Sequence, residues 1–296
     1  MKKLLFIYNA KSGKAMVKRN LADIIDTFIK AGYTVEAYQT QKAGDATEQI
    51  IARGEEFEHI VCCGGDGTLN ETVSGLMQIE KRPTLGYIPG GSTNDFANSL
   101  KLPKNMVNAA KVAVCGKEAK IDVGDFNGKK FIYIAGFGAF TDVSYQTPQE
   151  LKNVLGHQAY LIEAVKKLPQ IKGYYISCRF DGCILEGEFI YGMVSNSSSV
   201  AGIQGITGKD ISLNDGMFEV TLVRPPKNII ELQAMIAELL NGGDNCENVI
   251  RFKTHKLTVT SEESIAWVLD GESGGSTKKA VISNIESAIT MKAYKK

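Results

Sequence analysis

Hydrophobic residues in the first 120 positions occur in short runs that alternate with stretches of helical spacing. Four of these runs have strand length: Leu4–Tyr8, Thr34–Tyr38, Ile60–Cys63 and Leu85–Ile88. Between the first two, apolar residues recur every three or four positions and predict a helix with one buried face, formed by Leu21, Ile24, Ile25 and Phe28. Gly32 is suited to ending that helix. Such alternation predicts a parallel α/β domain whose ligands bind at the carboxyl ends of the strands.

The pattern changes after Ile121–Gly124 to short strands separated by turn residues. The expected strands are Lys129–Ala135, Tyr174–Phe180, Cys183–Ser195, Gly216–Val223, Thr254–Thr260, Ala266–Leu269 and Ala288–Ala293. Asp181-Gly182 is typical of a hairpin turn. Two helices are predicted within this region, over about Gln149–Leu168 and Lys227–Leu240. We therefore expect a β-rich second domain, built as a sandwich.

Composition narrows the class of protein. The chain has 296 residues with 44% hydrophobic and 23% charged residues, which is ordinary for a globular enzyme. A formal net charge of +1 argues against a nucleic-acid partner. We see no cleavable leader, no apolar stretch near the ~20 residues of a membrane span and no C-x-x-C among the six cysteines. The sequence thus predicts a cytoplasmic protein whose membrane contact is peripheral.

The segment Gly64–Glu71 follows the third apolar run and carries three glycines around one carboxylate. Glycines at 64, 65 and 67 can take positive φ and let the backbone approach a phosphate. Asp66 is suited to Mg²⁺, which binds one or two carboxylates together with phosphate oxygens. Thr68 fits a helix N-cap, with Glu71 completing a capping box. The alternative is a tight strand-to-helix turn with a solvated aspartate.

A second loop, Pro89–Ala97, follows the next apolar run and has a similar character. Ser92 and Thr93 offer hydroxyl and N–H groups to a nucleotide, while Asn94 and Asp95 are expected to brace the loop. Two such loops after neighbouring strands make a phosphate site more plausible than two unrelated turns.

Together the two loops resemble the lipid-kinase superfamily of diacylglycerol, sphingosine and ceramide kinases, and the bacterial diacylglycerol kinase-like branch in particular. The resemblance implies a NAD kinase/phosphofructokinase-like α/β N-terminal domain and a β-sandwich C-terminal domain. The expected boundaries are 1–124, joined by the returning segment 285–296, for the nucleotide-binding domain. The acceptor and catalytic-base domain is expected over 125–284.

The resemblance extends to Asn9–Lys14, which is similar to the family's N-P-x-S-G-K with Ala10 in place of proline. It is not a Walker A loop, because Ala15 stands where that motif requires Ser or Thr. Thr40 begins a T-x-x-x-G-D-A segment that resembles another family motif. The implied ligands are ATP and Mg²⁺. The implied nucleotide-binding residues are Asn9, Ala10, Lys11, Ser12, Gly13, Lys14, Thr40, Gly64, Gly65, Asp66, Gly67, Thr68, Leu69, Asn70, Glu71, Ser92 and Thr93.

Leu269–Glu272 resembles the family's D-G-E motif, which implies that Glu272 is the catalytic base beside Asp66 in the active site. Asp270 would hold a lysine or a nucleotide-side contact; a plain Asp-Gly hairpin is the alternative. A further resemblance implies a structural Mg²⁺ held by the Asp215 carboxylate and two carbonyl groups, those of Ser212 and Met217. As bare chemistry, the Asn214–Gly216 segment is simply a good turn.

These residues predict a lipid kinase that transfers the γ-phosphate of ATP to a lipid hydroxyl, with diacylglycerol as the default acceptor at a membrane surface. Two alternatives stay open: a soluble-substrate kinase such as NAD kinase, and a non-catalytic nucleotide- or lipid-binding module. The oligomeric state is also open, with a homodimer as one option. The helix over Gln149–Leu168 could dock on a membrane, although an amphipathic helix facing the core is the commoner case.

Overall fold

The computed structural model describes residues 2–13, 16–91, 94–138, 172–197, 199–200, 203–204, 211–241 and 246–294. The chain divides into two compact units. The first comprises Met1–Val123, Leu213–Asp215 and Ile285–Lys296, and the second comprises Gly124–Ser212 and Gly216–Asn284. Two strands, β5 (Lys117–Phe126) and β16 (Glu272–Ala293), contribute residues to both units.

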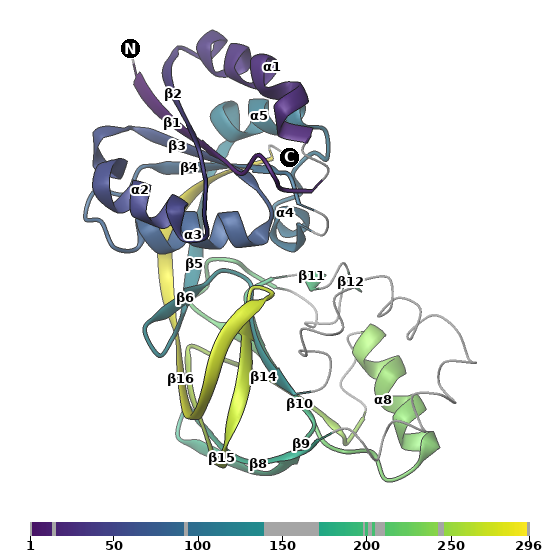
Figure 1. Cartoon of the computed structure of the whole chain (residues 1–296). Coiled ribbons are helices and arrows are strands. Elements are labelled where there is room, and N and C mark those ends of the chain that lie inside the picture. The colour runs from purple at the N-terminus through teal and green to yellow at the C-terminus, as the bar shows by residue number, and fades with distance from the viewer. Residues whose placement is uncertain are drawn as a thin grey trace. The chain divides into compact units, whose positions relative to one another are not determined.

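The first unit is a parallel sheet with helices on both faces (Figure 1). Its strands are β1 (Lys2–Tyr8), β2 (Tyr33–Gln39), β3 (His59–Gly64) and β4 (Thr84–Pro89), in the spatial order β4-β3-β1-β2. The end of β16 joins the β4 edge in parallel, with Met291 opposite Leu85. Its helices are α1 (Met16–Lys30), α2 (Asp45–Arg53), α3 (Asp66–Leu76), α4 (Asp95–Ser99) and α5 (Met106–Cys115), with a 3₁₀ turn at Gly54–Glu56.

Strand β1 shows why this sheet needs two layers of helices. Leu4 and Phe6 point to one face and pack with α1 and α5, where Phe28 and Ala109 are buried in the same cluster. Leu5 and Ile7 point to the other face and are also fully buried. A strand that is apolar on both faces is typical of parallel sheets covered on both sides. On that second face α2 and α3 pack closely, because Gly75 of α3 lies against Ile50 of α2.

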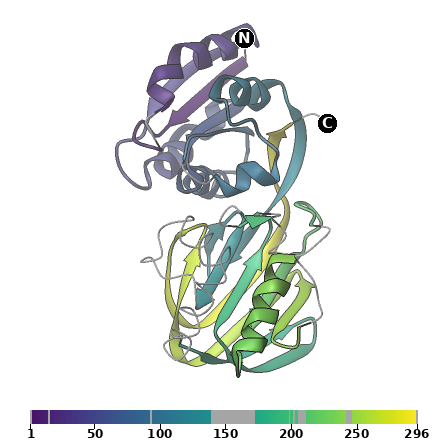
Figure 2. The same ribbon diagram turned by 90° about the vertical axis from the view of Figure 1, so that its right-hand side faces the viewer.

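The second unit is β-rich and antiparallel. Its further elements are β6 (Lys129–Phe131), β7 (Ile134–Gly138), β8 (Tyr174–Phe180), β9 (Cys183–Phe189), β10 (Tyr191–Ser195), β11 (Ser199–Val200), β12 (Ile203–Gln204), β13 (Phe218–Val223), α8 (Ile229–Asn241), β14 (Val249–Thr254) and β15 (Lys256–Leu269). An aromatic core lies within it, where Trp267 contacts Phe126 and Phe137 at centroid distances of 5.0 and 4.9 Å. Helix α8 packs on the opposite face, through Leu232 and Met235 (Figure 2).

The predicted fold class, parallel α/β followed by a β-rich region, is confirmed. Several strand boundaries in the second unit were predicted wrongly. Lys129–Ala135 is two strands, because the backbone at Ile132 and Tyr133 turns to bond a distant carboxylate. Cys183–Ser195 is also two strands, with the break at Ile190, whose N–H donates to Val223.

Two further strands differ from the prediction, and one of these differences has a clear physical cause. Strand β15 runs unbroken from Lys256 to Leu269 where two strands were expected, since an irregularity between Thr260 and Ile265 accommodates the polar residues there. Strand β5 was missed altogether. The helix expected over Gln149–Leu168 lies outside the described residues. Among the residues that the structure describes, none of the helices has the length and apolar character needed to cross a membrane.

Candidate functional site

The sheet of the first unit brings three loops to one edge. The order in which strands are added to the sheet reverses between β1 and β3, because β2 and β3 lie on opposite sides of β1 while all of these strands stay parallel. The carboxyl ends of strands at such a switch point are where α/β sheets bind ligands. Asn9 leaves β1 at this point and donates its N–H to Cys63 of β3 at 2.9 Å. The loops after β3 and β4 follow on the same edge, since these strands are parallel neighbours.

The two glycine loops pack directly on each other. Gly90 donates its N–H to the carbonyl of Gly64 at 2.7 Å. A methyl group placed on Gly91 would lie 2.6 Å from the Cα of Gly65, which no side chain could accept without backbone movement. Gly13 joins this packing: its φ is +54°, and a methyl group there would lie 2.4 Å from the Gly90 oxygen. All three loops therefore approach one another closely through their backbones.

The reason given for the glycines after β3 was wrong. None of Gly64, Gly65 and Gly67 has positive φ. Gly64 is needed because a Cβ there would meet the Thr68 hydroxyl at 2.4 Å, so the close approach of a side chain, and not an unusual φ, explains this glycine. A Cβ on Gly65 would lie 3.4 Å from the Cα of Gly91, which is an ordinary contact distance.

The predicted capping box at α3 is also wrong. The helix begins at Asp66, and its N-cap is Gly65 with an extended backbone (φ −83°, ψ −175°). Thr68 therefore lies inside the helix, with its side chain packed against Gly64. The carboxylate of Glu71 instead accepts the backbone N–H groups of Gly44 (2.8 Å) and Ala46 (3.4 Å), at the start of α2. Glu71 thus braces the loop that contains the predicted Thr40 segment.

Asp66 is the first residue of α3 and is partly exposed. One carboxylate oxygen accepts the N–H of Asp95 at 3.1 Å, which links the two glycine loops. A carboxylate at a helix N-terminus is favoured by the helix dipole. Asn94, with φ 52°, closes the second loop by accepting the Gly91 N–H at 2.8 Å and donating to the Gly91 carbonyl at 2.7 Å. Asn94 therefore braces the loop, as the sequence indicated.

Tyr87 lies beneath these loops and was not identified from the sequence. Its hydroxyl is within 3.2 Å of the Gly64 carbonyl and 3.4 Å of Asn94 Oδ1. Burial, and then the negative charge of Asp66, raises the pKa of Tyr87 well above its ordinary value. The hydroxyl is consequently protonated and can donate to the loop. A tyrosine in an apolar strand gives no such signal in the sequence.

The loop after β1 is ordered by its own first residue. Asn9 accepts the N–H of Lys11 on its side chain at 2.9 Å and that of Ser12 on its carbonyl at 3.1 Å. Ala10, which replaces the family's proline, is buried. Thr40 bonds the same region, because its N–H donates to the Tyr8 carbonyl at 3.0 Å and its hydroxyl approaches that carbonyl at 3.4 Å.

Other predicted residues have less to offer a ligand or cannot be placed. Leu69 has a buried side chain, and its N–H bonds the Gly65 carbonyl at 3.1 Å. Asn70 is half-buried and accepts the Ser74 hydroxyl at 3.4 Å. Lys14, Ser92 and Thr93 lie outside the described residues.

Cys62 and Cys63 stand in β3 directly before the glycine loop. Burial raises the pKa of both thiols, to about 12 at Cys63. Neither thiol is therefore a nucleophile at neutral pH. They act as small apolar residues in the strand.

The D-G-E motif of the second unit forms the hairpin between β15 and β16. Asp270 and Gly271 have φ of 50° and 85°, and Leu269 pairs with Glu272. The carboxylate of Asp270 is buried and accepts three successive backbone N–H groups, from Ile132 (2.7 Å), Tyr133 (3.0 Å) and Ile134 (3.0 Å). These three bonds hold backbone, and the lysine or nucleotide-side contact expected of Asp270 stays a prediction.

Glu272 lies one residue beyond that hairpin turn and is exposed. The side chain of Glu272 has no hydrogen bond or ion pair with any other residue that the structure describes. The hairpin and catalytic interpretations of this motif are therefore compatible. The turn fixes the backbone, and the glutamate side chain is accessible.

The segment that carries the predicted metal residues lies on the border of the units along the chain. Asp215 is exposed, Ser212 is half-buried, and the Met217 carbonyl accepts the Asn284 side chain at 3.2 Å. Nearby in the first unit, buried Asp122 accepts the Ser287 N–H at 2.6 Å and donates its own N–H to Leu213. Within the described part of the chain, no group of three or more His, Cys, Asp or Glu side chains could hold a metal.

Comparisons with known proteins agree with this arrangement. The diacylglycerol kinase catalytic domain family matches residues 3–126. A diacylglycerol kinase of Bacillus subtilis (strain 168) is 38% identical over 278 residues, which cover 93% of this chain and 91% of that protein. The diacylglycerol kinase of Staphylococcus carnosus (strain TM300) is 38% identical over 277 residues, with 93% and 90% covered.

Solved structures agree over the whole chain. A crystal structure of a diacylglycerol kinase from Bacillus anthracis str. Sterne has a TM-score of 0.79 at 25% identity, covering 99% of this chain and 97% of that one. Another from the same organism, described as a candidate diacylglycerol kinase, has a TM-score of 0.83 at 29% identity with the same coverage. The extent of these similarities, together with the glycine loops that meet at the switch point, shows that the chain belongs to the diacylglycerol kinase family of ATP-dependent lipid kinases.

Proposed function

We propose that this chain transfers the γ-phosphate of ATP to the free hydroxyl of diacylglycerol, giving phosphatidic acid and ADP. The observation that carries the proposal is the packing of three side-chain-poor loops beside Asp66 at the start of α3. Family membership supports the lipid acceptor, since the relatives at 38% identity are diacylglycerol kinases. In this proposal the first unit binds the nucleotide, and the second supplies the catalytic base and contacts the acceptor.

The residues at the loops fit a nucleotide with Mg²⁺. Gly13 and Gly91 lie against neighbouring backbone where a Cβ would collide, so these loops carry no side chain there. Loops without side chains at such positions let backbone N–H groups approach phosphate oxygens. Asp66 presents a carboxylate at the helix N-terminus, and Mg²⁺ takes one or two carboxylates with phosphate oxygens. When bound, Mg²⁺ would neutralise phosphate charge during transfer. The predicted nucleotide residues from Asn9 to Lys14, from Gly64 to Glu71, and Thr40, Ser92 and Thr93 belong to this proposal.

Glu272 is assigned the role of general base. Its carboxylate would take the proton from the acceptor hydroxyl as that oxygen forms a bond to the γ-phosphorus. The bond between the γ-phosphorus and the β–γ bridging oxygen breaks, and ADP leaves with the electron pair. Glu272 is exposed, while Asp270 beside it is buried and occupied by backbone donors, which favours Glu272 of the two acids. We also assign a structural Mg²⁺ to Asp215 and the carbonyls of Ser212 and Met217.

The test is transfer of labelled γ-phosphate from ATP to diacylglycerol in mixed micelles, with Glu272→Gln beside the wild type. Loss of a general base typically lowers the rate ~10²–10⁴-fold. Glu262→Gln is a matched control, because Glu262 is an exposed glutamate in the preceding strand β15. The control should retain full activity, and Asp66→Asn should lose at least as much activity as Glu272→Gln.

The same assay separates the competing acceptors. Product on another lipid would preserve the mechanism and change the substrate. Phosphorylated NAD without any lipid product would contradict the lipid acceptor. A Glu272→Gln enzyme as active as the wild type would contradict the assignment of the base.

A further inference from the structure

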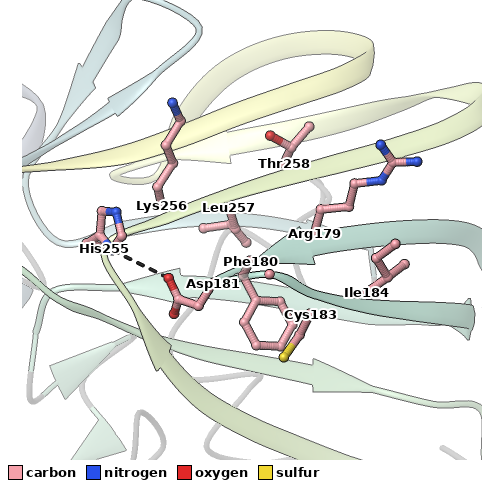
Figure 3. Close-up of a pocket in the computed structure, with 10 residues that line it drawn as sticks. Arg179, Phe180, Asp181, Cys183, Ile184, His255, Lys256, Leu257 and Thr258 are labelled. Atoms are coloured by element: carbon pink, nitrogen blue, oxygen red, sulfur yellow. Dashed lines mark ion pairs between the residues drawn. The ribbon is translucent and has the colours of Figure 1, made fainter.

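The second unit has a surface pocket of about 420 Å³ that contains none of the predicted active-site residues (Figure 3). It lies where the β8–β9 hairpin meets the turn between β14 and β15. Arg179, His255 and Lys256 are its basic residues, and Asp181 is its one acid. The pocket therefore carries an excess of basic over acidic side chains.

The sheet register places the two permanent cations close together. Arg179 of β8 lies opposite Thr258 of β15, and Lys256 is two residues before Thr258 on the same face. Diagonal neighbours of this kind are within reach of long side chains. Figure 3 shows the side chains of Arg179, Lys256 and Thr258 projecting to the same side of the sheet. In Figure 3 the two charged ends extend away from one another on either side of Thr258, so one phosphate group contacts both cations only when these flexible side chains turn toward it.

The cations of this pocket are available for a ligand. Arg179 and Lys256 have no ion-pair partner anywhere in the described part of the chain. Asp181 lies 3.5 Å from His255, so the one acid of the pocket is turned toward the imidazole. Two residues before Arg179 on β8, Ser177 lies opposite Glu186 of β9 and Thr260 of β15, and Thr260 lies opposite Lys279 of β16. The charges of Glu186 and Lys279 cancel, so these neighbouring positions add no net charge to the surface.

The pocket also has an apolar rim. Ile184 of β9 lies opposite Arg179 and is 61% exposed. The hairpin that carries it is tight, because Asp181 and Gly182 occupy a two-residue turn with φ of 45° and 78°. An anion with an attached apolar group suits this surface better than a free anion does.

We propose that this pocket binds the phosphate of an anionic phospholipid at a bilayer surface, with Ile184 entering the apolar boundary. Resting on the proposed function, this assigns the lipid kinase a docking site separate from its active-site residues. Arg179 and Lys256 share the phosphate, and His255 lies beside it when protonated. The surface is specific for anionic bilayers, since its attraction is electrostatic.

The experiment is co-sedimentation of the full chain with vesicles, without ATP, so that it does not depend on phosphoryl transfer. Vesicles of phosphatidylcholine alone are compared with vesicles containing phosphatidylglycerol. Arg179→Ala/Lys256→Ala should lower the partition constant for anionic vesicles roughly 25-fold, the product of about fivefold for each cation. Ile184→Ser should lower it roughly fivefold.

Lys104→Ala/Lys111→Ala is the matched control, because it removes two exposed lysines of the first unit and changes the net charge equally. This control should bind anionic vesicles as the wild type does. Equal loss in both double variants, or no loss in the pocket variant, would overturn the proposal. Stabilisation of the wild type by inorganic phosphate, lost in the pocket variant and without vesicle binding, would also overturn it in favour of a soluble anion.

Discussion

The contact between the two glycine loops allows a sharp test with the substitution Gly91→Ala. A methyl group on Gly91 would lie 2.6 Å from the Cα of Gly65 and 2.9 Å from Asn94 Oδ1. Real Cβ contacts of this kind require about 3.4 Å or more, and both neighbours are held in place. Gly65 is the N-cap of α3, and Asn94 is bonded to Gly91 itself. Neither can move without opening the loops.

The expected magnitude follows from the size of this overlap. Forcing a methyl group into a packed site typically costs about 1–3 kcal/mol. For a chain of this size that lowers Tm by roughly 2–4 °C per kcal/mol. Because the loops are the proposed phosphate site, a displacement near 1 Å should also lower kcat/KM for ATP by up to roughly 100-fold.

Gly65→Ala is the matched control, since it adds the same methyl group from the other side of the same contact. That methyl would lie 3.4 Å from Gly91 Cα, and the φ of −83° at Gly65 suits alanine. Differential scanning fluorimetry of the nucleotide-free proteins should therefore show a clear loss for Gly91→Ala and a change within about 1 °C for Gly65→Ala. Equal Tm values for the two variants would refute the reasoning that the loops are held by backbone contact.

Three further substitutions test contacts away from the loop interface. Glu71→Ala leaves the N–H groups at the start of α2 unpaired, so the free energy of unfolding measured with urea should fall by about 1–2 kcal/mol. We also expect a higher KM for ATP, and an unchanged KM would separate Glu71 from the nucleotide site. Asp270→Asn weakens the hydrogen bonds that hold the hairpin before Glu272. Steady-state kinetics should then show a lower kcat and an unchanged KM for ATP. A purely structural role for Asp270 would lower Tm alone. Burial lowers the pKa of His59 to about 4 in the folded state. Between pH 6.5 and 4 the unfolded chain binds more protons than the folded chain, so about 3 kcal/mol of stability is lost as the pH falls through that window. The Tm of His59→Gln should therefore fall less steeply with pH than that of the wild type. An identical dependence of Tm on pH in the two proteins would contradict this account.

The strands and loops of the first unit could be predicted because each depends on nearby residues. Apolar runs such as Ile60–Cys63 and the glycines that follow them specify a buried strand and a turn without reference to the rest of the chain. The capping of α3 could not be predicted in the same way. Thr68 and Glu71 have the spacing of a capping box. In the structure, however, the Thr68 side chain packs against Gly64, and the Glu71 carboxylate accepts the N–H of Gly44 in a different loop.

The second unit was harder to predict because its details depend on contacts between distant residues. The break after β6 exists because N–H groups at Ile132 and Tyr133 bond Asp270, which is 137 or more positions away in the chain. No local pattern near residue 132 indicates that acceptor. The type of turn at Asp181-Gly182 was predictable, since both of its φ values follow from the two residues themselves.

The two acids of the D-G-E motif show how structure divides roles that the sequence leaves equal. Asp270 is buried, and three backbone N–H groups donate to its oxygens, so its carboxylate is engaged in holding the backbone. Glu272 is two residues away, exposed and without such donors among the described residues. A general base must be able to reach a hydroxyl proton and to hold it. In the proposed mechanism the exposed carboxylate of Glu272 therefore reaches the acceptor hydroxyl, while Asp270 fixes the turn from which Glu272 extends.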